Sequence, residues 1–215
     1  MNILFISLGC DKNLVDSEVM LGLLNEKGYQ IVDDETQADV IVINTCSFIH
    51  DAKEESIQTI LEMAEYKNSG RLKALIVTGC LAQRYQQEIL EEIPEVDAVL
   101  GTTCYGKIVE TVEEALAGNG HVEVTDINAL PLVDSKRLVT TGGHFAYLKI
   151  AEGCDKHCTY CIIPKLRGNF RSVPMERLIK EAEDLAEQGV KELILVAQET
   201  TLYGKDIYGE KSLHK

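Results

Sequence analysis

Three cysteines in the second half of the chain stand at a spacing that suits a metal centre. Cys154, Cys158 and Cys161 form the pattern C-x3-C-x2-C in a polar stretch. A 4Fe-4S cluster normally takes four cysteine ligands, so three would leave one iron open for a ligand or substrate. A zinc site would need a fourth ligand, for which His157 is the available candidate. The spacing favours a reactive iron–sulfur centre over an electron-storage one, with zinc as the alternative.

Three further cysteines share a position relative to apolar, β-rich runs of the sequence. Each follows one of the runs 3–8, 40–44 and 74–78 after a single intervening residue: Cys10, Cys46 and Cys80. Strand ends of one sense lie on the same edge of a parallel sheet, so we expect these thiols to converge. One cysteine after a strand is usually a small buried hydrophobe, but three in equivalent places predict a shared metal centre.

The seventh cysteine, Cys104, also follows a strand signal, three residues after Gly101. As a fourth ligand it would close the site formed by Cys10, Cys46 and Cys80, but a single extra cysteine is more often structural, and we expect that here.

The sequence begins without the basic leader of a signal peptide. Cysteines in a reducing compartment are more often metal ligands or catalytic groups than disulfide partners.

The elements that must position these thiols alternate between strand and helix over the first 120 residues. Strand signals cover 3–8, 40–44, 74–78 and 96–100, and helix signals cover 13–27, 51–67, 83–92 and 106–117. Such alternation implies right-handed crossovers and a parallel sheet covered on both faces. We therefore expect an α/β fold, with a doubly wound parallel-sheet domain over residues 1–120.

The remaining residues divide into a linker and a second domain. Residues 121–144 contain Pro131, mixed charges and a Gly-Gly pair, which indicate a linker, although 121–124 could form an edge strand. Residues 145–215 show a strand over 145–150, a helix over 175–188 and a strand over 192–197. A complete eight-stranded α/β barrel takes about 250 residues, so we expect only the first βα units of a barrel, an incomplete domain.

The distribution of charge limits the kinds of partner. Residues 1–120 hold 8 Lys and Arg against 21 Asp and Glu, whereas residues 145–215 hold 11 of each. An acidic surface cannot displace the counterions of a phosphate backbone, so the first half is more suited to a basic protein. Apolar runs stay far below the roughly 18 residues of a membrane span. We expect a cytoplasmic protein with no membrane partner, for which nucleic acid binding is disfavoured.

With both cysteine triplets in view, the chain resembles the methylthiotransferase branch of the radical S-adenosylmethionine enzymes. The second triplet, with Tyr160 before its last cysteine, matches the superfamily motif, and the first triplet matches the cysteines that bind a second cluster in this branch. Residues 7–18 and 151–168 look most like the RimO type, which modifies a ribosomal protein. The tRNA-modifying MiaB type usually reads Gly-Cys-Gln-Met-Asn at the first cysteine, where this chain has Gly-Cys-Asp-Lys-Asn.

The resemblance implies an enzyme that methylthiolates the β-carbon of an aspartate in small-subunit ribosomal protein twelve. Its cofactors would be two 4Fe-4S clusters, one on each triplet, and S-adenosylmethionine chelated at the open iron of the cluster on the second triplet. An electron from that cluster would yield a 5′-deoxyadenosyl radical, which takes hydrogen from the aspartate, while the other cluster presents sulfur. Tyr160 would lie near the adenosine, and Gln198 and Glu199 near the amino group. The cofactors would do the hard chemistry and the protein would supply position and electrostatics.

The resemblance also implies partners and alternatives. The substrate would be the small-subunit ribosomal protein, and an electron donor would be needed. The family continues through the rest of the barrel into a small β-domain, called TRAM, that this sequence does not contain, so we expect the chain alone not to turn over. A MiaB-type tRNA adenosine methylthiotransferase, an electron-transfer protein with closed clusters and a zinc-stabilised interaction module remain the alternatives.

Overall fold

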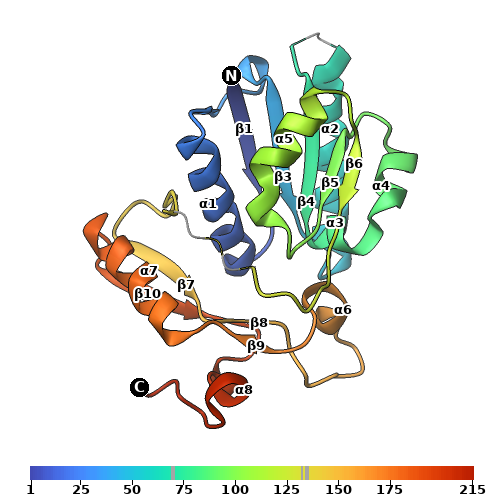
Figure 1. The fold of residues 1–215 in the computed structure, drawn as a ribbon. Helices are drawn as coiled ribbons and strands as arrows, with labels where there is room; N and C mark the ends of the chain where they lie inside the picture. Colours follow the sequence, from blue (N-terminus) through green and yellow to red (C-terminus); the bar gives the residue numbers. More distant parts are fainter. Residues whose placement is uncertain (69–70, 132, 134–135) are drawn as a thin grey trace. The chain divides into compact units, whose positions relative to one another are not determined.

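The computed structural model describes residues 1–68, 71–131, 133 and 136–215. These residues form two compact units, Met1–Arg137 (unit 1) and Leu138–Lys215 (unit 2). Figure 1 follows both units along the chain, from blue at the N-terminus to red at the C-terminus. None of the helices in these described ranges is both long and apolar enough to cross a lipid bilayer.

Unit 1 is built on a six-stranded sheet in which every paired strand runs parallel to its neighbour. The strand order is β2-β1-β3-β4-β5-β6. The strands are β1 (Asn2–Ser7), β2 (Gln30–Val32), β3 (Val40–Thr45), β4 (Ala74–Gly79), β5 (Ala98–Leu100) and β6 (His121–Glu123). The predicted doubly wound α/β fold is thereby confirmed, and β2 is a short strand that the sequence pattern did not indicate.

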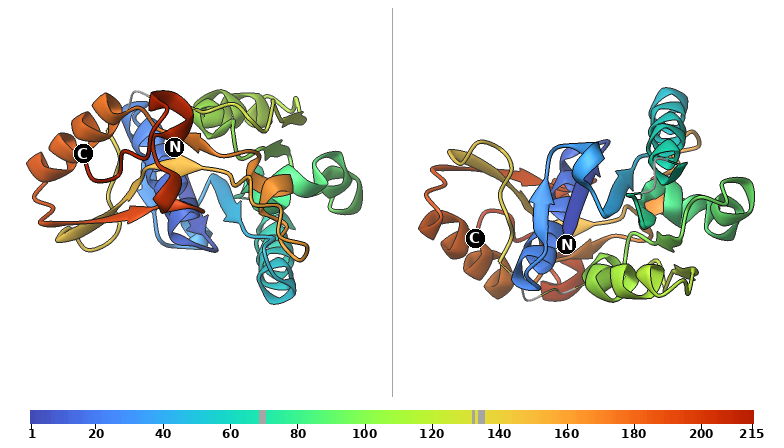
Figure 2. Two further views of the ribbon diagram at one scale, coloured as in Figure 1. Left: turned by 90° about the horizontal axis from the view of Figure 1, so that it is seen from below. Right: turned by 90° about the horizontal axis from the view of Figure 1, so that it is seen from above.

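Helices cover both faces of this sheet. The helical elements are α1 (Asp11–Glu26), η1 (Glu35–Gln37), α2 (His50–Asn68), α3 (Cys80–Tyr85), α4 (Gln87–Glu92), η2 (Tyr105–Lys107) and α5 (Ile108–Leu116). Figure 2 shows α2, in cyan, and α5, in yellow-green, on opposite sides of the strands. The side chains of β3 alternate accordingly, since Ile41 and Ile43 pack with α2 and α3, whereas Val40 and Val42 pack with α1 and α5. Both faces are therefore buried, as a parallel sheet requires.

The helix predicted over residues 83–92 is divided in the structure. Helix α3 begins at Cys80 itself, and α4 begins at Gln87. Between them Gln86 has a φ of 43°, a left-handed backbone conformation that is costly for a residue with a Cβ. One periodic apolar stretch thus forms two short helices that meet at an angle set by Gln86.

The described residues among 121–131, 133 and 136–137, which the sequence pattern assigns to a linker, pack as part of unit 1. Strand β6 pairs with β5 at the edge of the sheet. Further along, the Tyr105 hydroxyl donates to the carbonyl of Pro131 (3.3 Å), and the Arg137 guanidinium lies 3.2 Å from the carboxylate of Glu18. The side chains of Arg137 and Glu18 are both buried. These contacts hold the segment against the first domain although its composition is that of a loop.

Unit 2 contains one complete βα unit and the parallel strand that follows it. Strand β7 (Phe145–Lys149) pairs in parallel with β10 (Glu192–Val196), and α7 (Met175–Glu187) connects them. A short antiparallel pair, β8 (Ala151–Glu152) and β9 (Arg171–Ser172), brackets the long loop and α6 (Ile163–Arg167). The element η3 (Thr200–Leu202) and α8 (Lys205–Tyr208) follow β10. The core of the unit includes Leu148, Ile150, Leu178 and Tyr203.

Candidate metal centres

The first cysteine triplet lies along one edge of the sheet of unit 1. Strands β1, β3 and β4 are direct neighbours, and Cys10, Cys46 and Cys80 follow their carboxyl ends. Cys10 is the residue before α1, and Cys80 is the first residue of α3. Cys46 and Cys80 are buried, whereas Cys10 is exposed. Three thiols that are far apart in the sequence therefore share the edge where parallel α/β sheets place their binding sites.

Asn13 connects these three strand ends, and sequence reasoning missed it. Its side-chain amide donates to the carbonyl oxygens of Leu8 (3.0 Å) and Thr45 (2.9 Å). Its amide oxygen lies 3.8 Å from the sulfur of Cys80. The residue is fully buried in the first turn of α1. The signal that could have found it is a polar, amide-bearing residue three positions after Cys10 on a helix that must pack against the sheet.

Two glycines allow close approach of the backbone at this edge. Gly9 has a φ of +95°, and a Cβ there would lie 2.9 Å from the Cβ and 3.2 Å from the sulfur of Cys46. Gly79 has a φ of +90°, and a Cβ there would collide with the Asn44 side chain and the backbone of Thr45. Only glycine adopts such a backbone without strain. The Gly-Cys pairs at the ends of β1 and β4 are thus a geometric requirement of this edge.

The cysteines at this edge are free thiols. In the described residues they are not arranged as a complete metal site. All seven cysteines, each within the described ranges, are present as thiols rather than disulfides. Within those ranges no group of three or more His, Cys, Asp or Glu side chains is arranged to hold a metal ion. Thiols are nevertheless the ligands that iron–sulfur clusters take, and two of these are buried where solvent would not compete. The donor chemistry of the edge therefore fits an iron–sulfur cluster.

Cys104 has different surroundings. It is buried in the core between the sheet and helices α1 and α5. Its sulfur lies 3.1 Å from the hydroxyl of Thr125. A small, buried cysteine with a hydroxyl neighbour is an ordinary packing residue. Its environment agrees with the structural role expected for it.

The second triplet lies in a loop of unit 2 that is fastened at its first residues. The backbone N–H of Cys154 donates to the carbonyl of Gly168 (3.1 Å), and Asp155 accepts a hydrogen bond from the N–H of Phe170 (2.9 Å). Gly153, which precedes Cys154, has a φ of +73°, and a Cβ there would collide with the backbone of Asn169. The segment that follows β8 is therefore held against the segment that precedes β9.

The remaining part of this loop is open to solvent. Cys158 is exposed, and Cys154 and Cys161 are partly exposed. His157 has a φ of +46°, which turns the chain between the first two cysteines. The ring of Tyr160 is 90% exposed. Three accessible thiols on an exposed loop can take up the positions that a cluster imposes.

A buried charged group supports the base of the loop. Glu152 lies 3.1 Å from the Arg167 guanidinium and 3.7 Å from the Lys149 ammonium, and all three side chains are buried. Burial by itself raises the pKa of Glu152, but the positive charges of Lys149 and Arg167 outweigh it and hold the pKa below its ordinary value of 4.5. Glu152 is thus a carboxylate at neutral pH. Removing one partner would leave a buried charge uncompensated, which is strongly destabilising.

The end of β10 is connected to the cysteine loop by an ion pair that sequence reasoning did not anticipate. Lys156, between Cys154 and Cys158, pairs with Glu199 just after β10. The hydrogen bond from Lys156, together with that from Thr201, lowers the pKa of Glu199 to about 2. The sequence predicts that Glu199 contacts a cofactor amino group, and in this structure its carboxylate forms an ion pair with Lys156. The pair spans 43 residues of sequence, so no local pattern reveals it.

Gln198 shows the clearest sign of a missing polar partner. Both its amide oxygen and its amide nitrogen are buried and make no hydrogen bond with any residue that the structure describes. A buried amide without hydrogen bonds costs about 1–3 kcal/mol, so such groups call for an explanation. A polar ligand at the carboxyl end of β10 would supply the bonds. The residues present therefore fit a small polar cofactor such as S-adenosylmethionine at this position.

Comparison with known families agrees with both units. Residues 148–215 match the family described as the Radical SAM superfamily. Residues 2–101 match the family described as Uncharacterized protein family UPF0004. The first βα unit with a C-x3-C-x2-C loop after its strand is thus the start of a radical S-adenosylmethionine domain, preceded by a doubly wound cysteine-bearing domain.

Similar proteins narrow the class to one family. The chain is 67% identical over 213 residues to "Ribosomal protein uS12 methylthiotransferase RimO" of Lachnoclostridium phytofermentans, covering 99% of the chain and 48% of that protein. Proteins of the same description from Desulforamulus reducens (56% over 209 residues) and Clostridioides difficile (55% over 207 residues) cover 97% and 96% of the chain and 47% of their own lengths. Over nearly its whole length the chain is thus similar to radical S-adenosylmethionine methylthiotransferases of the RimO type. It spans about half the length of the curated relatives it matches.

The match to the Radical SAM superfamily and the similarity to these relatives imply S-adenosylmethionine and iron–sulfur chemistry. The loop thiols of unit 2, the edge thiols of unit 1 and the buried amide of Gln198 are the groups of this chain that fit those cofactors.

Proposed function

We propose that the chain forms the first half of an enzyme that methylthiolates the β-carbon of an aspartate in small-subunit ribosomal protein uS12. The observation that carries the proposal is the pair of cysteine sets, one in each unit, with three thiols rather than four in each. Three ligands leave one iron of a 4Fe-4S cluster open, which a reaction centre needs and an electron-storage centre does not. The identity of 67% to a relative described as a uS12 methylthiotransferase supports the choice of reaction.

In unit 2, Cys154, Cys158 and Cys161 would hold one 4Fe-4S cluster. When bound together with S-adenosylmethionine, such a cluster supplies the one-electron cleavage of a carbon–sulfur bond that begins radical chemistry. The buried amide of Gln198 would hydrogen-bond the polar amino-acid end of S-adenosylmethionine, because it has both a donor and an acceptor to offer. Glu199 would keep Lys156, and with it the loop, close to the end of β10. Exposed Tyr160 would cover the adenosine.

In unit 1, Cys10, Cys46 and Cys80 would hold a second 4Fe-4S cluster. Asn13 would position the strand ends that carry them, since it bonds the backbone after both β1 and β3. Gly9 would let the backbone after β1 lie close to Cys46, and Gly79 would let the end of β4 lie close to Asn44 and Thr45. A cluster with an open iron at this edge would present sulfur for transfer, and a cytoplasmic electron donor would be required.

The cluster assignment is tested by anaerobic reconstitution of the chain with iron and sulfide. We expect iron and sulfide contents that correspond to two 4Fe-4S clusters, and an electron paramagnetic resonance signal of which one component responds to S-adenosylmethionine. Cys158→Ala should remove the responsive component and leave the other, and Cys46→Ala should do the reverse. Cys104→Ala is the matched control and should retain both. Zinc as the only bound metal would contradict the proposal.

The substrate assignment is tested by mass spectrometry. The chain joined to the C-terminal half of the Lachnoclostridium phytofermentans relative is incubated with purified uS12, S-adenosylmethionine and a reductant, and in parallel with tRNA. We expect a gain of one methylthio group on an aspartate of uS12 and none on tRNA. Modification of tRNA instead of uS12 would assign the MiaB-type activity.

A further inference from the structure

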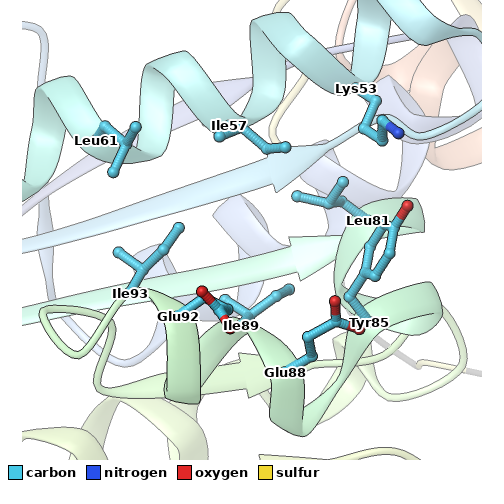
Figure 3. Close-up of a pocket in the computed structure, with 9 residues that line it drawn as sticks. All are labelled: Lys53, Ile57, Leu61, Leu81, Tyr85, Glu88, Ile89, Glu92 and Ile93. Carbon is cyan, nitrogen blue, oxygen red and sulfur yellow. The ribbon is translucent and has the colours of Figure 1, made fainter.

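An apolar groove on unit 1 lies between helices, and one end of it is lined by Leu81, the residue after Cys80. It has a volume of about 370 Å³ and runs between α2 on one side and α3 and α4 on the other. Figure 3 shows Ile57 and Leu61 pointing from α2 toward Ile89 and Ile93, with Leu81 deeper between the helices. Residues of both α3 and α4, the helices that Gln86 separates, line the groove.

The walls of this groove expose more apolar surface than a helix face normally leaves in water. Ile57 is 37% and Leu61 45% exposed, whereas Leu81 and Ile89 at the base are buried. Ile57 and Leu61 are four residues apart, so they form a continuous ridge along α2. Apolar surface that is contiguous and rimmed by polar residues typically marks an interaction site rather than a neutral surface.

The rim of the groove is strongly acidic. Residues 50–68 and 80–95, which carry the two sides, hold nine Asp and Glu against three Lys and Arg. Lys67 is already neutralised by Asp97 (2.6 Å), and the cations left beside the groove are Lys53 and Arg84, which lies over the ring of Tyr85. Glu88 and Glu92 line the groove on the α4 side, and in the described part of the chain neither forms an ion pair. The unneutralised charge around this apolar groove is therefore negative.

We infer that this groove docks a basic segment of the protein substrate that inserts apolar side chains between α2 and α4. The inference rests on the proposed function for the class of partner, a ribosomal protein. Such a segment complements the groove in charge and in polarity. Its cationic side chains would meet Glu88 and Glu92, and its apolar side chains would fill the groove. A nucleic acid would be repelled by the same carboxylates, and a second copy of this acidic unit would repel the first. The volume accommodates a few side chains, so a short segment docks rather than a folded domain.

The test measures binding of purified uS12 to the chain by isothermal titration calorimetry at low and moderate salt. The double variant Ile57→Gln/Leu61→Gln removes the apolar ridge, and Glu88→Lys/Glu92→Lys reverses the rim. We expect each to raise the Kd about tenfold or more, as for central interface residues. The matched control Asp33→Lys/Glu110→Lys makes the same change in net charge at exposed positions away from the groove. It should leave most of the affinity intact.

Three results would overturn the docking site: equal Kd values for the groove variants and the wild type, equal losses in the groove and control variants, or no binding of uS12 by the wild-type chain. Hydrogen exchange of the wild-type chain gives a second measurement that needs no substitution, since α2 and α4 should gain protection when uS12 is added. The same groove variants in the joined enzyme should raise KM for uS12 and leave kcat unchanged. If uS12 is methylthiolated with unchanged KM, the groove fails and the proposed function stands, whereas absence of methylthiolation by the wild-type enzyme rejects the function itself.

Discussion

Strands β3 and β10 look alike in sequence and differ completely in their surroundings. β3 lies between β1 and β4, and all six of its residues are buried. β10 pairs with β7, and four of its five residues are exposed, among them Leu193, Ile194 and Leu195. An apolar run therefore predicts a strand but not whether neighbours cover it. The thiols of unit 1 follow strands inside a six-stranded sheet, whereas the residues after β10 in unit 2 follow a strand of a two-stranded sheet.

The largest expected effect is a difference in the stability lost when a side chain is truncated in β3 and in β10. Ile43→Ala in β3 removes a fully buried side chain from the core, which should lower the free energy of unfolding of unit 1 by about 2–5 kcal/mol. Leu195→Ala in β10 removes one that is 46% exposed, and should cost less than about 1 kcal/mol. Hydrogen exchange resolved by segment measures both. Equal losses in the two units would show that β10 is as well covered as β3.

Glycines with similar backbone angles give a second contrast. Gly79→Ala should lower the stability of unit 1 by more than the roughly 1–3 kcal/mol of backbone strain, because the new Cβ also collides with Asn44 and Thr45. Gly189→Ala in unit 2, where the φ is +98° and nothing lies near the new Cβ, should cost only the strain. Thermal unfolding compares the two, and iron content after reconstitution should fall only for Gly79→Ala. A Gly189→Ala variant as unstable as Gly79→Ala would contradict the role of close approach at the thiol edge.

Asn13 tests whether the thiol edge depends on one side chain. Asn13→Ala leaves the carbonyls of Leu8 and Thr45 without these buried donors, which should cost about 1–3 kcal/mol. We expect weaker iron binding in unit 1 with the unit 2 cluster unaffected, measured by iron counting on the Cys158→Ala background. Asn68→Ala, which loses only an exposed hydrogen bond to Glu65, is the control. Normal iron content in Asn13→Ala would mean that the strand ends hold their positions without it.

The smallest expected effect is a pH dependence confined to unit 1. The N–H of Asn2 donates to Asp39 (2.8 Å), and this hydrogen bond, with a lesser effect of Lys73, holds the pKa of Asp39 below its ordinary value of 3.8. The stabilisation is therefore present above pH 3.8 and is lost as the pH falls below it. It should amount to less than about 1 kcal/mol, since Lys73 is largely exposed. Urea unfolding at several pH values between 5 and 3 gives the free energy of unfolding as a function of pH. This free energy should fall less steeply with falling pH in Asp39→Asn than in the wild type, and an equal pH dependence in the two proteins would refute the assignment.

Much of the architecture was predictable because it depends on local pattern. Alternating strand and helix signals indicate a parallel sheet, and the sheet alone places Cys10, Cys46 and Cys80 on one edge. Strand β2 was missed because three residues are too few to show a period. The break at Gln86 was missed because nothing in its type requires a positive φ.

The contacts that complete the site were beyond local pattern. Asn13 acts through backbone groups of two different strands, and Lys156 meets a carboxylate that is distant in sequence. The buried amide of Gln198 becomes noticeable only when its neighbours are known. Sequence spacing located the thiols, whereas their supports depend on the packing of the folded chain.

The uncovered face of β10 has a consequence for handling the protein. Short strands of high β-propensity and low charge with an open edge are the segments from which aggregates nucleate. Residues 193–197 are such a segment, and beyond its pairing with β7 no other described strand protects β10. Concentrated solutions of the chain should therefore lose material through this segment first, while mutual repulsion keeps the acidic N-terminal unit dispersed.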